Sequence, residues 1–144
     1  YYGEGPRFRP VMQLRARILQ IKEVGPGTTI GYGPLFVTER TTRVAILPIG
    51  YADGLSCRLG NKMHMLVHGK IVSQIGRLCM DYCMLDVTDV PNAKEGDVAT
   101  VFGEDGSQMI SVQDHALLYP GTASELICLL GRRIPRFYRQ DKFL

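Results

Sequence analysis

The stretch VMQLRARILQIKEV, from Val11 to Val24, decides how this sequence folds. Its first apolar side chains alternate with polar ones, at Met12, Leu14, Ala16 and Ile18. A period of two predicts a β-strand rather than a helix, because successive side chains of a strand point to opposite faces. The apolar positions then change phase to Leu19 and Ile21. Such a change predicts a bulge, or a strand that turns a corner between two sheets.

Further short strands are predicted on the C-terminal side of this stretch. The apolar or alternating stretches are TTRVAILPIG (41–50), LCMDYCMLDVTDV (78–90) and VATVFGEDG (98–106). Pro48 has no backbone N–H, so the pairing of its strand ends there or leaves a bulge. MHMLVHGKIVSQIG (63–76) predicts a hairpin that turns at His68 and Gly69.

Two short helices are predicted near the C-terminus. Ser111 is placed to cap the first, with Asp114 three residues further on in the position of the capping-box acid. Thr122 is placed to cap the second. RRIPRFY (132–138) predicts a last strand, at a sheet edge because Pro135 is tolerated only there.

The chain is therefore predicted to be mainly β, as a small Greek-key-like antiparallel barrel with two short helices near the C-terminus. Its 144 residues, 45% hydrophobic and 22% charged, suit one domain over 1–144. The longest apolar runs, such as LICLL (126–130), are far shorter than the ~20 residues of a membrane helix.

Charge and cysteine spacing argue against two kinds of site. The net charge is +3, and the basic residues are scattered except in GRRIPRFYRQDK (131–142), which indicates a solvated helix end followed by a basic strand or tail rather than a nucleic-acid site. Free thiols and no metal are expected, because the cysteines form no Cys-x-x-Cys pair and the histidines complete no zinc spacing. The four cysteines are Cys57, Cys79, Cys83 and Cys128.

Four motifs in order resemble the C-terminal domain of alanine racemases and their serine-racemising relatives. They are RPVMQLRARILQIKEVGPGTTIGYG (9–33), LPIGYADG (47–54), GRLCMDYCMLDVTDV (76–90) and GRRIPRFY (131–138). The resemblance implies a pyridoxal phosphate enzyme that interconverts L- and D-alanine and supplies D-amino acids for peptidoglycan. It also implies an N-terminal (β/α)8 barrel, absent from this chain, that carries the cofactor and its lysine. In this family two subunits form a homodimer, and each active site lies between one subunit's barrel and the C-terminal domain of the other.

The resemblance implies that Tyr32, in IGYGPLF, is a catalytic base. Racemisation removes the α-proton from one face of the substrate and returns a proton to the other, so two opposed bases are needed. The family uses a lysine of the barrel and a tyrosine of the partner's C-terminal domain. Glycine on both sides of Tyr32 lets the backbone turn sharply and keeps bulk away from a substrate. From spacing alone, a turn tyrosine with its hydroxyl in water would be the ordinary interpretation.

Five more residues match substrate-binding positions of the family. Tyr51 would line the way to the active site, and Arg77 and Arg58 would border it. The backbone N–H of Met80 would contact the substrate carboxylate, with Asp81 beside it. From the residues alone, packing explains Tyr51 equally well, and surface charge explains Arg58 almost as well.

One departure from the family lies in GTASELICLLGRR (121–133). Family members usually carry a tyrosine in the helix that begins near Thr122, and its hydroxyl reaches the cofactor phosphate. Here no tyrosine is present, the segment is one residue short, and Ser124 is the nearest candidate for the phosphate. A smaller residue predicts room for serine as well as alanine, as in membrane-bound serine racemases.

Two rival functions stay open at this point. One is the β domain of a pyridoxal phosphate-dependent amino-acid decarboxylase, in which Cys79 would be taken for the catalytic acid. The other is a freestanding β-barrel binding module. No lysine has the family's cofactor-binding setting, so the isolated domain is expected to be inactive. The resemblance predicts a cytoplasmic protein, with a membrane anchor upstream if it is of the serine racemase type, and no nucleic-acid partner.

Overall fold

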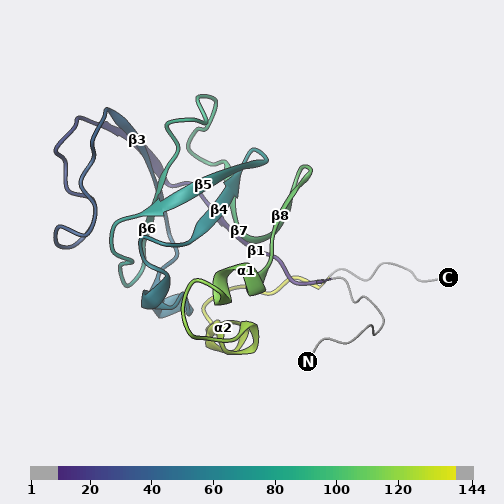
Figure 1. Cartoon of the computed structure of the whole chain (residues 1–144). Coiled ribbons are helices and arrows are strands. Elements are labelled where there is room, and N and C mark those ends of the chain that lie inside the picture. The colour runs from purple at the N-terminus through teal and green to yellow at the C-terminus, as the bar shows by residue number, and fades with distance from the viewer. Residues whose placement is uncertain (1–9, 139–144) are drawn as a thin grey trace.

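The computed structural model describes residues 10–138 and shows strands followed by two short helices (Figure 1). The first strands are β1 (Leu14–Arg17), β2 (Gln20–Val24) and β3 (Thr42–Leu47). Two 3-10 helices follow, η1 (Tyr51–Asp53) and η2 (Cys57–Leu59). The later strands are β4 (His64–Val67), β5 (Lys70–Ile75), β6 (Cys83–Asp86), β7 (Val98–Asp105) and β8 (Gln108–Ile110). The helices α1 (Val112–Ala116) and α2 (Ala123–Leu129) complete the order. The prediction of a mainly antiparallel β fold with two short helices is confirmed.

The strands form one antiparallel path in the order β1-β7-β4-β5-β6-β3-β2, with β8 paired to β7. Only Ile18 and Leu19 separate β1 from β2. The N–H of Ile18 donates to the carbonyl of Asp97, beside β7, whereas the N–H of Leu19 donates to the carbonyl of Ile46 in β3. The chain therefore turns a corner between two sheets where the apolar phase changes. This corner joins the two ends of the path, so the sheet closes into a small barrel.

The barrel interior holds a continuous apolar core. Ala45, Met65, Leu85 and Val101, from four different strands, are fully buried in it. Figure 1 shows α1 and α2 together beside the sheet, while the loop between β2 and β3 projects away from it. This loop, residues 25–41, carries Tyr32.

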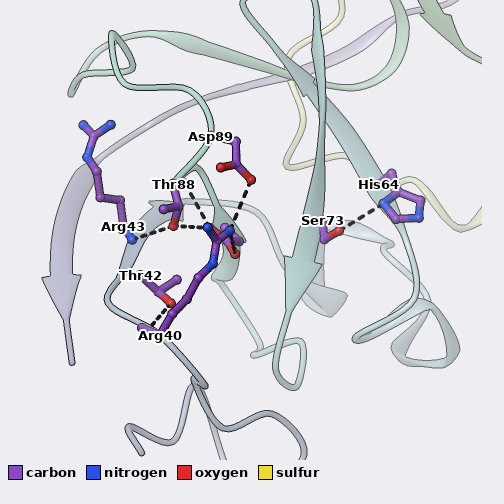
Figure 2. Close-up of polar contacts among 8 residues, drawn as sticks. Arg40, Thr42, Arg43, His64, Ser73, Thr88 and Asp89 are labelled. Carbon is purple, nitrogen blue, oxygen red and sulfur yellow. Dashed lines mark hydrogen bonds and ion pairs between the residues drawn. The ribbon is translucent and has the colours of Figure 1, made fainter. Parts of the chain in front are cut away.

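The start of β3 is fixed by arginine contacts, some of which Figure 2 shows. The backbone N–H of Arg43 donates to the hydroxyl of Thr88, and its guanidinium donates to backbone carbonyls of the turn at 90–93. The Arg40 guanidinium lies 3.2 Å from the Asp89 carboxylate. These contacts anchor the C-terminal end of the 25–41 loop.

Both predicted helix caps are confirmed. The Ser111 hydroxyl accepts from the N–H of Asp114, and the Asp114 carboxylate accepts from the N–H of Ser111, which completes a capping box. The hydroxyl of Thr122 accepts from the N–H of Glu125 at the start of α2.

The predicted last strand over 132–138 is wrong, because these residues form turns and extended chain without strand pairing. Pro135 has no N–H to contribute to a sheet. Arginine side chains hold the segment instead: Arg133 pairs with two carboxylates, and Arg136 donates to the carbonyl of Leu130. The predicted strand over 78–90 is also shorter than expected, since only Cys83–Asp86 pairs in the sheet.

Candidate functional site

Tyr32 lies at the tip of the loop between β2 and β3, which forms a narrow arm. The two legs of the arm are hydrogen-bonded, with the N–H of Ile30 donating to the carbonyl of Phe36 at 3.0 Å. Gly31 and Gly33 both have positive φ, 77° and 72°, which favours glycine on each side of the tyrosine. The arm leaves 71% of Tyr32 exposed, so the structure presents this phenol to the outside.

The arm packs through Gly31, directly beside Tyr32, on residues 77–82, which we call the central segment. A Cβ atom placed on Gly31 would lie 3.2 Å from the carbonyl oxygen of Arg77 and 3.3 Å from its nitrogen. The same atom would lie 2.9 Å from the terminal methyl of Met84. The glycine therefore lets the arm approach the beginning of the central segment.

The other end of the central segment packs on η1. The N–H groups of Tyr51 and Ala52 donate to the carbonyls of Cys79 and Met80, at 3.1 and 2.9 Å. A Cβ on Gly50 would lie only 2.3 Å from the Cys79 oxygen, so a side chain there would separate the two segments. Tyr51 thus begins a 3-10 helix that lies directly on the central segment.

Met80 offers a backbone donor at this point. Its side chain is 54% exposed and its carbonyl accepts from Ala52. Its N–H makes no hydrogen bond within residues 10–138. A free N–H in a fixed turn is suited to a carboxylate, because its direction is set before a ligand binds.

Arg133 joins the central segment to η1 from the C-terminal side. Its guanidinium lies 2.7 Å from Oδ1 of Asp81 and 3.4 Å from Oδ1 of Asp53. The hydrogen bond to Asp81 and the charge of Asp53 raise the pKa of Arg133. The sequence placed Arg133 in a basic stretch and a predicted edge strand and gave it no role in the site, although the motif GRRIPRFY had marked this stretch.

The structure thus brings Tyr51, Met80 and Asp81 together and places Arg77 beside the arm of Tyr32. It does not connect Arg58 or Ser124 to them by a hydrogen bond or ion pair among the described residues. The Arg58 guanidinium lies over the ring of Tyr119, 5.7 Å from its centre. Ser124 is exposed in the first turn of α2.

The two cysteines near the central segment are poor nucleophiles. Burial raises the pKa of Cys79, whose thiol donates a long hydrogen bond of 3.8 Å to the carbonyl of Arg77. Burial raises the pKa of Cys83 to about 12. Both shifts favour the thiol over the thiolate, and the thiolate is the reactive form.

Within residues 10–138, no three residues of the metal-binding types His, Cys, Asp and Glu gather in one place. None of the helices in this range has the length and apolar character required to cross a bilayer.

Comparison with known proteins gives a consistent result. Residues 11–138 match the family model "Alanine racemase, C-terminal domain". The chain is 42% identical to the alanine racemase of Methanococcus maripaludis and 44% identical to alanine racemase 2 of Caldanaerobacter subterraneus subsp. tengcongensis, with 95% and 91% of the chain aligned.

A solved structure supports the same relationship. The alanine racemase of Bacillus anthracis with bound L-Ala-P superposes with a TM-score of 0.87 at 30% identity over 92% of this chain. The chain spans only 36% and 34% of the lengths of the two sequence relatives, and 34% of that structure. The chain belongs to the alanine racemase C-terminal domain family.

Proposed function

We propose that this chain is the part of an alanine racemase that supplies Tyr32 as a base to the active site of a partner subunit. One observation carries the proposal: an exposed phenol stands on a glycine-flanked arm, and the glycine that precedes it packs on the segment that carries the free Met80 N–H. The relatives are named alanine racemases, but this chain covers only about a third of their length. The cofactor-binding barrel and the homodimer are therefore part of the proposal.

The described residues fit the substrate side of such a site. Pyridoxal phosphate, when bound, withdraws electrons from Cα and makes the α-proton acidic. From this chain, the hydroxyl of Ser124 is the group proposed to meet the phosphate of the cofactor. This hydroxyl is exposed and makes no hydrogen bond within residues 10–138. The barrel is proposed to hold most of the cofactor.

Each residue of this chain then has a distinct task. The Oη atom of Tyr32 takes the α-proton from one face of alanine, or returns a proton to that face in the reverse direction. The N–H of Met80 donates to the substrate carboxylate and fixes its orientation. Arg77, whose backbone lies against Gly31, brings positive charge beside the arm. Tyr51, Asp81 and Arg58 border the approach. The product, D-alanine, would serve peptidoglycan synthesis.

The test is Tyr32→Phe in the longer protein that carries this chain together with its cofactor domain. We expect racemisation of both enantiomers to fall by about 10²–10⁴-fold, because one of the two bases is lost. The remaining base serves one face only. In D2O, α-proton exchange should therefore persist for one enantiomer and be lost for the other.

Tyr138→Phe is the matched control, since Tyr138 is 86% exposed and makes no hydrogen bond within residues 10–138. It should racemise alanine at the wild-type rate. A Tyr32→Phe protein that inverts alanine as fast as the wild type would refute the proposal.

We further propose serine as a second substrate, because the segment after Thr122 lacks the tyrosine that the family uses there. Ser124, the residue nearest to that position, is smaller than a tyrosine and would leave space beside a substrate side chain. The measurement is racemisation of serine and alanine by the same longer protein. Serine turnover that is negligible beside alanine turnover would remove serine from the proposal.

A further inference from the structure

Three segments distant in sequence meet at one guanidinium. Arg133 follows α2, Asp53 ends η1, and Asp81 belongs to the central segment. The central segment carries Met80, and η1 begins with Tyr51. The contact therefore lies between the two groups that the proposed function places around the substrate.

The carboxylate of Asp53 depends on this contact. Asp53 is only 6% exposed. One carboxylate oxygen accepts from the N–H of Gly50 at 3.0 Å, and the other faces the Nε of Arg133 at 3.4 Å. A buried carboxylate that loses its cationic partner keeps the cost of burial without the compensation, so the surrounding segment must move or take up water.

Arg133 itself is held against η1 by the backbone. The N–H of Gly131 donates to the carbonyl of Asp53 at 2.9 Å. A Cβ on Gly54 would lie 2.1 Å from the carbonyl oxygen of Leu129, so the end of α2 is in close contact with the residue after η1. The guanidinium thus extends from a fixed base to the more exposed carboxylate of Asp81.

We propose that Arg133 is a positioning residue of the racemase reaction: by joining Asp53 to Asp81 it holds η1 and the central segment, and so Tyr51 and the Met80 N–H, in the arrangement that binds the substrate. The inference rests on the proposed function. Arg133 acts through these residues and not on the reacting atoms. Its loss should therefore affect substrate binding more than the proton transfer at Tyr32.

The experiment is Arg133→Met in the longer protein, with kcat and KM measured for alanine in both directions. We expect KM to rise roughly tenfold to a hundredfold with a smaller change in kcat, because a displaced binding group misplaces the substrate. A purely structural role would reduce the fraction of active protein, which lowers the apparent kcat and leaves KM unchanged. An unchanged KM in a folded Arg133→Met protein would overturn the inference.

Two matched variants sharpen the result. Arg132→Met removes the neighbouring exposed arginine, which makes no ion pair or hydrogen bond within residues 10–138, and should keep the wild-type KM. Arg133→Lys keeps the charge but cannot span two carboxylates in a fork, so it should recover only part of the KM. Full recovery with lysine would contradict the bridging role.

If Arg133→Met fails to fold, Arg133→Lys decides, because it keeps the charge and removes the fork that spans the two carboxylates. A raised KM supports the inference and an unchanged KM overturns it. Failure of the proposed function is separate: it would appear as an active Tyr32→Phe protein, whatever Arg133 does.

Discussion

Gly50 shows how one residue without a side chain sets the geometry of the candidate site. Its φ of −150° is ordinary extended backbone, so conformational strain does not require glycine there. Space does, because a Cβ would lie 2.3 Å from the Cys79 oxygen and 2.4 Å from the Met80 oxygen. Both atoms are backbone and cannot rotate away. The contact between η1 and the central segment therefore depends on a missing methyl group.

Gly50→Ala should destabilise the 144-residue chain by about 1–3 kcal/mol, the usual cost of forcing an extra methyl into a packed site. The measurement is the free energy of unfolding in urea. Gly25→Ala is the control, because a Cβ at Gly25 has no atom within 4 Å, and its effect should stay within about 0.5 kcal/mol. Equal stability of the two variants would show that the close approach at Gly50 is not required.

At the scale of elements, sequence patterns correctly predicted the features that depend on residues close together in the chain. The phase change after Ile18 predicted the corner between β1 and β2, because side-chain period and strand pairing are linked along the chain. The caps Ser111 and Thr122 were predictable for the same reason, since each acts on its own helix. The hairpin of β4 and β5 also formed where its turn residues, His68 and Gly69, placed it.

The elements that sequence patterns misplaced are governed by distant contacts. Residues 78–82 alternate like a strand but leave the sheet, because η1 takes up the carbonyls of Cys79 and Met80. Residues 132–138 look like an edge strand, yet the ion pairs of Arg133 reach back to Asp53 and Asp81. No periodicity encodes a contact across that separation. The exposure of Tyr32 was predictable, because the glycines that indicate it are its neighbours in sequence. The role proposed for Arg133 needed the structure, because it depends on contacts with distant residues.

At the scale of the whole molecule, the helices are attached to the barrel through a buried histidine. His115 in α1 is only 4% exposed, and its Nε2 lies 2.9 Å from the backbone carbonyl of His64 in β4. The carbonyl can only accept, so this nitrogen carries a proton, and a neutral imidazole satisfies the contact. Burial lowers the pKa of His115, and the hydrogen bond to His64 and the charge of Asp114 oppose that shift only in part.

This depressed pKa predicts how stability depends on pH. An unfolded chain binds a proton at His115 near pH ~6.5, whereas the folded chain binds it only at lower pH. Below about pH 6.5 the unfolded state therefore holds more protons, and the free energy of unfolding should fall as the pH decreases. His115→Gln keeps an N–H donor without a charge that titrates, so it should lose less stability between about pH 7.5 and 5.5. Urea unfolding of both chains at the two pH values measures the difference. An identical pH dependence in the two chains would show that His115 binds its proton equally well in the folded and unfolded states. It would contradict the neutral, buried imidazole that joins α1 to β4.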